Sequence, residues 1–228
     1  KGRCEILYDN AVYFGDTING TPNGKGIIYW NDSESVYVGE FNNGKREGYG
    51  TFIWKDGTYF QGFLDKNNIK SHGLIFVNNL DRPTIYVGEV KTDSIATRHG
   101  YGVQYFYTPG VQHDLMSDPI EVISTSFKDN VPYGVCYILE DVDTETERTS
   151  IGTCAGWSSR DYNFKYTGIP DVSFEKNIER VVDVSINFSV EAEKLANQTY
   201  QVAFGEDIIE KEEKKIVKET QPQIQLVP

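Results

Sequence analysis

The stretch Tyr37-Val-Gly-Glu-Phe-Asn-Asn-Gly-Lys-Arg-Glu-Gly-Tyr-Gly-Thr-Phe-Ile-Trp-Lys-Asp-Gly-Thr58 decides the fold of this chain. Together with Val36 before it, this stretch holds two alternating, aromatic-rich segments, residues 36–41 and 50–54, which flank a turn-rich connection over residues 42–48. The Asp56-Gly57 pair that follows is a strong turn signal. The stretch is therefore predicted to form a β-hairpin that leads directly into another hairpin.

The same pattern of aromatic residues and glycines recurs along the first half of the chain. Four copies begin at the aromatic-x-Gly signatures of Tyr13, Tyr37, Phe60 and Tyr86. One hairpin cannot bury its own apolar face, so stacked hairpins must share a core. The predicted fold is mainly β: an elongated single-layer antiparallel meander in which the glycines take positive φ or allow close backbone approach.

The chain divides into five predicted segments. They are an N-terminal cap (1–12), four repeats (13–107), a loop with degenerate repeats (108–160), a β-rich C-terminal cap region (161–205) and a charged helix with an extended tail (206–228). Within the cap region, alternating apolar residues over 181–188 predict a strand. Residues 190–196 are expected to form a short helix, and residues 200–204 a further strand.

The repeat resembles, nearly position for position, the MORN repeat (membrane occupation and recognition nexus). The quoted stretch and residues 13–35 match well, residues 59–80 match in part, and residues 86–107 match apart from an insertion. The resemblance implies a curved sheet whose aromatic-lined groove holds a helix or peptide of a partner protein. Members of this family serve as scaffolds in ciliary, cytoskeletal and junctional assemblies, and some carry catalytic domains beside their repeats.

Aromatic and acidic side chains of the repeats are the candidate partner-binding residues. A single-layer sheet has too little chain to cover both faces, so part of its aromatic surface is predicted to be open to a partner. Packing between neighbouring hairpins is the alternative for each ring, and a solvated strand position is the alternative for each acid. The candidates are Tyr13, Tyr37, Glu40, Trp54, Phe60, Tyr86, Glu89, Tyr101 and Tyr105.

Net charge narrows the class of partner. The chain carries a formal charge of -12, which disfavours nucleic acid and makes binding to membrane lipid unfavourable. The acids and this charge favour a basic amphipathic segment of a protein partner. No apolar run approaches the length needed to cross a bilayer, so we expect a soluble, cytoplasmic protein.

The cysteines bear on the compartment. Cys4, Cys136 and Cys154 are odd in number and include no close pair, which argues against a zinc site and a disulfide framework. A reducing, intracellular compartment is the expectation that follows. The glycosylation triplets at Asn19, Asn31, Asn187 and Asn197 point weakly the other way.

No pattern for catalysis is found in the sequence. The sequence contains no nucleophile elbow that could work with a histidine; the histidines are His72, His99 and His113. It also contains no metal-ligand spacing and no phosphate-binding loop. The acidic run over residues 141–147 lacks the glycine and glutamate spacing of a calcium loop. We therefore expect a non-enzymatic scaffold without catalytic residues, cofactor or metal.

Two alternatives stay open. Residues 127–137 resemble the repeats that precede a SET-type lysine methyltransferase domain, so the chain could be the repeat region of a larger enzyme. The repeats could also attach the protein to a membrane surface, although the acidic charge opposes this.

Overall fold

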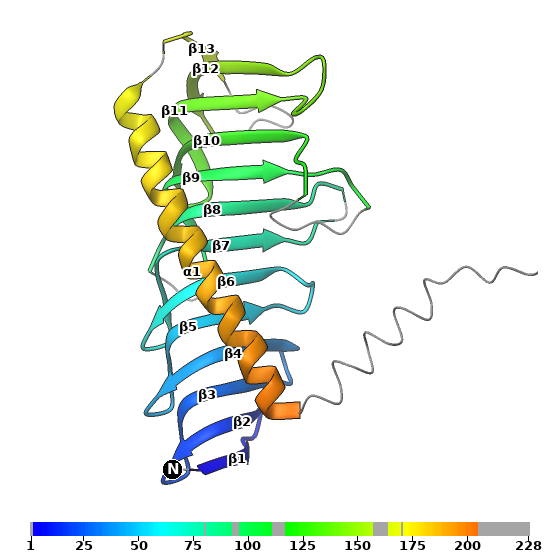
Figure 1. Cartoon of the computed structure of the whole chain (residues 1–228), viewed down its shortest axis with the longest axis vertical. Helices are drawn as coiled ribbons and strands as arrows, with labels where there is room; N and C mark the ends of the chain where they lie inside the picture. The colour runs from blue at the N-terminus through cyan, green and yellow to red at the C-terminus, as the bar shows by residue number, and fades with distance from the viewer. Residues whose placement is uncertain are drawn as a thin grey trace, which may run out of the picture.

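The structure is a computed structural model that describes residues 2–79, 81–92, 96–110, 117–156, 164–169 and 171–204, with side chains described up to residue 200. Within these ranges, thirteen strands form one antiparallel sheet in chain order, and helix α1 (Val172–Phe204) crosses one of its faces (Figure 1). The predicted fold class is confirmed. The strands are β1 Gly2–Leu7, β2 Ala11–Ile18, β3 Thr21–Trp30, β4 Ser35–Asn42, β5 Lys45–Ile53, β6 Tyr59–Asp65, β7 Asn68–Val77, β8 Thr84–Val90, β9 Arg98–Phe106, β10 Glu121–Lys128, β11 Val131–Glu140, β12 Arg148–Ala155 and β13 Lys165–Tyr166.

The hairpin connection is shorter than the sequence predicts. Strand β5 begins at Lys45, so the turn between β4 and β5 consists of Asn43 and Gly44 alone. Both residues have positive φ, 47° and 77°, which is the backbone that a two-residue Asn-Gly hairpin turn requires. The expected seven-residue connection over 42–48 is therefore wrong, and most of those residues pair in the ladder.

Aromatic rings packed on glycines form the core of the sheet. Each of the four signature rings lies over two glycines, one on its own strand and one on the next strand; for Tyr37 these are Gly39 and Gly50. Phe41 closes over Tyr13 and Tyr37 in edge-to-face contacts, with centroid distances of 5.0 and 5.4 Å. We call the sheet face that carries these rings the ring face and the opposite face the helix face.

The C-terminal region differs from its prediction. The strands expected over 181–188 and 200–204 and the short helix over 190–196 are all part of α1, one helix of 33 residues. Asp171 begins it, because its Oδ1 accepts hydrogen bonds from the backbone N–H groups of Ser173 and Phe174, both over 3.0 Å. The expected charged helix and tail over 206–228 lie outside the described residues.

The buried stripe of α1 explains the error. Its members recur every three or four residues over most of the helix, which is a helical period, but several of them are small or polar. Alternating valines and isoleucines between them gave the sequence its strand-like appearance. The stripe consists of Phe174, Val181, Ser185, Ser189, Ala192, Leu195 and Thr199.

A long helix can cover most of a narrow sheet. At about 1.5 Å per residue, 33 residues extend about 50 Å, and strands about 4.8 Å apart place about ten strands within that length. Accordingly, α1 contacts every strand from β2 to β9 and runs diagonally across them (Figure 1).

The far end of the sheet lies in the segment predicted as a loop with degenerate repeats (108–160) and consists of strands β10, β11 and β12. A disulfide joins Cys136 on β11 to Cys154 on β12, with a Cα–Cα distance of 5.6 Å. The expectation that no disulfide forms is therefore corrected. Sequence spacing gave no sign of this pair, because the strand register alone brings the two residues together.

Candidate partner-binding surface

The helix face is covered by the chain itself. The ring of Tyr101 packs against Phe174 of α1 with centroids 5.9 Å apart, and the ring of Tyr49 packs against Phe188 at 5.6 Å. Tyr105 joins the cluster on this face that also includes Val182 of α1. Two predicted partner-binding residues, Tyr101 and Tyr105, thus lie in the contact between the sheet and α1.

Small polar residues let α1 approach the sheet closely. Ser185 is fully buried, and its Oγ donates to Val181 O over 2.7 Å and lies 3.1 Å from Gly88 O. One turn further on, Ser189 Oγ donates to Gln61 Oε1 over 2.7 Å. These contacts fix the distance between the helix and the sheet, and they also fix the position of the helix along the sheet.

The four rings at the strand starts present no surface to a partner. Tyr13, Tyr37, Phe60 and Tyr86 each have an exposed fraction of 0%. The hydroxyls of the three tyrosines donate to backbone carbonyls of their own strands, as Tyr37 does to Glu40 O over 3.2 Å. In the structure, the packing alternative describes these four rings.

The two predicted groove acids bind backbone of their own repeats. Glu40 Oε2 accepts a hydrogen bond from the backbone N–H of Tyr49 over 2.9 Å, and Glu89 Oε2 accepts one from Tyr101 over 2.7 Å. Asp16 makes the equivalent, longer contact with the backbone N–H of Lys25 at 3.3 Å. Each acid stabilises the irregular stretch beside the register shift of its hairpin.

An apolar strip stays partly exposed on the ring face. Its rings are half-buried and contact one another: Trp30 stacks on Phe52 with centroids 5.6 Å apart, and Phe52 contacts Trp54 at 4.8 Å. We call this surface the aromatic strip. It consists of Ile28, Trp30, Phe52, Trp54 and Val77, all packed on the ring-face core. Of the predicted site residues, Trp54 alone belongs to it.

Two arginines border the aromatic strip. The Arg46 guanidinium lies over the rings of Trp30 and Phe52 at 5.4 and 5.5 Å, and burial lowers the pKa of its side chain. Arg98 holds the equivalent position two repeats further on, over Phe127 at 5.7 Å. Sequence reasoning missed both, although each stands two residues before the first glycine of a Gly-x-Gly pair.

A cavity of about 270 Å³ adjoins one end of the aromatic strip. It is mostly apolar, and Arg98 contributes a charged edge. The lining residues are Trp54, Thr58, Ile75, Val77, Ala96, Arg98 and Asn130.

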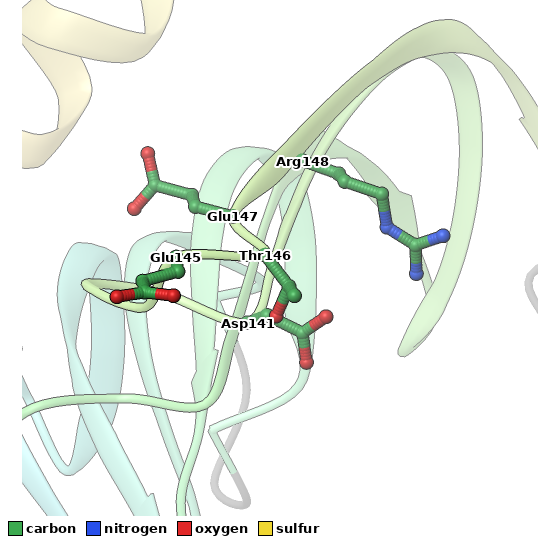
Figure 2. A pocket seen from close by; sticks show the side chains of 5 residues that line it. All are labelled: Asp141, Glu145, Thr146, Glu147 and Arg148. Carbon is green, nitrogen blue, oxygen red and sulfur yellow. The ribbon is translucent and has the colours of Figure 1, made fainter.

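A second hollow lies in the connection between β11 and β12 and is polar. Its lining side chains are Asp141, Glu145, Thr146, Glu147 and Arg148 (Figure 2). The carboxylates of Glu145 and Asp141 point to different sides, and Glu147 and Arg148 point away from each other (Figure 2). In the part of the chain that is described, no group of three His, Cys, Asp or Glu side chains is arranged to hold a metal ion.

Fold and surface together define a class: a single-layer array of β-hairpins built on a glycine–aromatic signature. The family model of the MORN repeat matches residues 13–35 and 37–59. Residues 13–35 and 37–59 are therefore MORN repeats, and repeats of this kind generally mediate protein or membrane interactions. No curated protein matches the chain. Across the described ranges, no helix has the length and apolar character needed to cross a bilayer.

Proposed function

We propose that this chain is a non-enzymatic scaffold that binds a helix or peptide of a partner protein through the aromatic strip. The observation that carries this proposal is the contrast between the two faces of the sheet. On the helix face, α1 packs against aromatic side chains such as Tyr49 and Tyr101, whereas on the ring face Trp30, Phe52 and Trp54 stay partly exposed beside a cavity. Clustered aromatic side chains next to a concavity are typical of protein-binding surfaces.

The positions of the described histidines support a role other than catalysis. His72 packs its ring near Phe188 of α1, with centroids 6.1 Å apart, and burial lowers the pKa of its imidazole. His99 is an exposed residue beside Asp129. The former supports the helix contact, and the latter stands apart from the aromatic strip. His113 lies outside the described residues.

The setting we propose is a larger assembly, cytoskeletal or ciliary, by analogy with scaffolds of the same repeat family. In such an assembly, α1 stiffens the array by tying its strands together along the helix face. The ring face then serves as the docking surface.

Capture of partners from a cell extract tests the proposal. The bait would be the full chain, compared with Trp30→Ala/Trp54→Ala and with the matched control Tyr29→Ala/Tyr133→Ala. Tyr29 is the strand neighbour of Trp30 and faces the opposite way, and both control residues are exposed, with fractions of 38% and 47%. Circular dichroism would establish that all three baits are folded.

The proposal predicts that a specific partner is retained by the control bait and lost by the tryptophan variant. Equal recovery of the same partners by all three baits would contradict it.

A further inference from the structure

We propose that the aromatic strip and its cavity bind an extended acidic segment of the partner, in which two carboxylates flank apolar residues. This inference rests on the proposed function and names the chemistry of the partner. It differs from the basic partner that the net charge of -12 predicts, because the charged groups beside the aromatic strip are arginines.

Arg46 is a half-buried cation over the rings of the aromatic strip. Its Nη2 donates to Asn67 O over 3.0 Å, its Nε donates to Asn67 Oδ1 over 3.5 Å, and its guanidinium lies over aromatic rings. These contacts are all with neutral groups, and the side chain is half-buried. A half-buried guanidinium attracts a carboxylate more strongly than an exposed one does, since less water screens the interaction.

Arg46 and Arg98 make matching backbone hydrogen bonds. The backbone N–H of Arg46 donates to Asn67 Oδ1 over 2.9 Å, and that of Arg98 donates to Asn130 Oδ1 over 2.8 Å. The two arginines therefore occupy equivalent places in their repeats. Both guanidiniums also lie over rings of the ring-face core. One cationic group thus lies over the aromatic strip, and another lines the cavity beside it.

The distance between the two arginines sets the distance between the two carboxylates of the ligand. Arg46 is on β5 and Arg98 is on β9, four strands away, which corresponds to about 19 Å at about 4.8 Å per strand. An extended peptide rises about 3.3 Å per residue, so about six residues separate carboxylates that reach both arginines. Alternate residues of such a peptide face the same way. If the carboxylates are at the first and seventh positions and face the sheet, the residues at the third and fifth positions also face the sheet.

The cavity determines what stands between the carboxylates. Trp54, Ile75 and Val77 give it apolar walls, and Arg98 lines it as well. At about 270 Å³ it is smaller than most ligand pockets, which start at about 300 Å³, and so it suits side chains better than a whole ligand. The resulting pattern is Glu-x-Leu-x-Leu-x-Glu.

The same residues argue for a peptide over an anionic membrane. The rings of the aromatic strip are half-buried, so a flat bilayer would reach them poorly. The charge of -12 also repels an anionic surface at long range, whereas a short peptide meets the arginines locally.

The test measures fluorescence anisotropy of labelled peptides with the full chain. The probes are a peptide with the core EGLSLGE, the same peptide with lysines in place of both glutamates, and one with serines in place of both leucines. We expect the first to bind at least tenfold more tightly than either of the others. Equal binding of the glutamate and lysine peptides would overturn the inference.

Variants of the chain locate the site. Arg46→Gln/Arg98→Gln should weaken binding of the EGLSLGE peptide at least tenfold, and Arg46→Lys/Arg98→Lys should retain more of it, because lysine keeps the charge. Unchanged binding by a folded glutamine variant would place the peptide elsewhere and overturn the inference. The comparison of peptides on the unmodified chain stands even if the glutamine variant fails to fold.

Vesicles containing phosphatidylserine serve as the competing probe. If they bind the chain while the EGLSLGE peptide does not, the inference is wrong and a lipid surface is the ligand. If the tryptophan variant loses its captured partner but no peptide binds, the proposed function stands and the acidic-segment inference fails.

Discussion

The ring of Tyr37 fills the space in which Gly50, on the neighbouring strand, has no side chain. A Cβ on Gly50 would overlap the Cε2, Cζ and hydroxyl atoms of that ring. The same relationship holds between Tyr13 and Gly26, and between Tyr86 and Gly102. The aromatic and the glycine positions of the repeat thus form one packing unit, which explains why they recur together.

Gly50→Ala should therefore destabilise the array. Overpacking of a tightly filled core costs about 1–3 kcal/mol, and the Tyr37 ring is held on its other side by Phe41. Urea unfolding would measure the loss. Gly2→Ala is the control, since a Cβ there meets open space, and it should change the free energy of unfolding little. Equal stability of the Gly50 variant and the wild type would disprove the packing unit.

Glu40→Ala should lower the free energy of unfolding by about 1 kcal/mol, because the backbone N–H of Tyr49 loses a charged acceptor at a half-buried position. Glu40→Gln should lose less, since the amide oxygen can still accept that hydrogen bond. Thermal or urea unfolding of the three proteins would check this order. If neither variant changes stability and both lose a partner, Glu40 is a binding residue after all.

Ser185→Phe should loosen α1 from the sheet. Ser185 is 0% exposed beside Gly88, and a bulky ring there would force the helix outward at a cost of about 1–3 kcal/mol. Val190→Phe is the matched control on the same helix, where the native side chain is 51% exposed. Hydrogen exchange of residues 172–200 should become faster in the first variant and stay unchanged in the second. Identical exchange in both variants would show that α1 is not packed as described.

Reduction should destabilise the end of the array around β11 and β12. The Cys136–Cys154 bond closes a loop of 18 residues, which corresponds to about 3 kcal/mol in the chain-entropy account. The thermal midpoint should fall on addition of dithiothreitol, and the double variant Cys136→Ser/Cys154→Ser should not respond to it. A wild-type midpoint that ignores the reductant would mean that the bond does not contribute to stability.

The regular part of the fold could be predicted because its signal is local. The spacing from Tyr37 to Gly39 and Gly50 is fixed by one hairpin, although the turn of that hairpin is shorter than predicted. The helix escaped prediction because its contact stripe holds Ser185 and Ser189, whereas the more apolar residues around them alternate as in a strand. Its partners on the sheet lie far earlier in the chain, as Tyr101 does for Phe174 and Gly88 does for Ser185, so no short window contains the contact.

The candidate site could be predicted only in part, for a similar reason. Sequence alternation shows that aromatic residues share a face, but it does not show whether neighbouring strands or a helix cover that face. Trp54 lies in the partly exposed aromatic strip, whereas Tyr101 lies against α1. Arg46 was missed because its position over the rings depends on the short turn before it.

Hydroxyl-radical footprinting of the chain, free and bound to the partner that capture identifies, tests the central claim most directly. The readout is side-chain oxidation, measured by mass spectrometry. Oxidation of Trp30 and Trp54 should fall several-fold in the complex, while that of Phe174 and Phe188 on α1 stays unchanged. Unchanged tryptophans together with increased oxidation of the two phenylalanines would contradict the claim, because the partner would then have displaced α1 and bound the helix face.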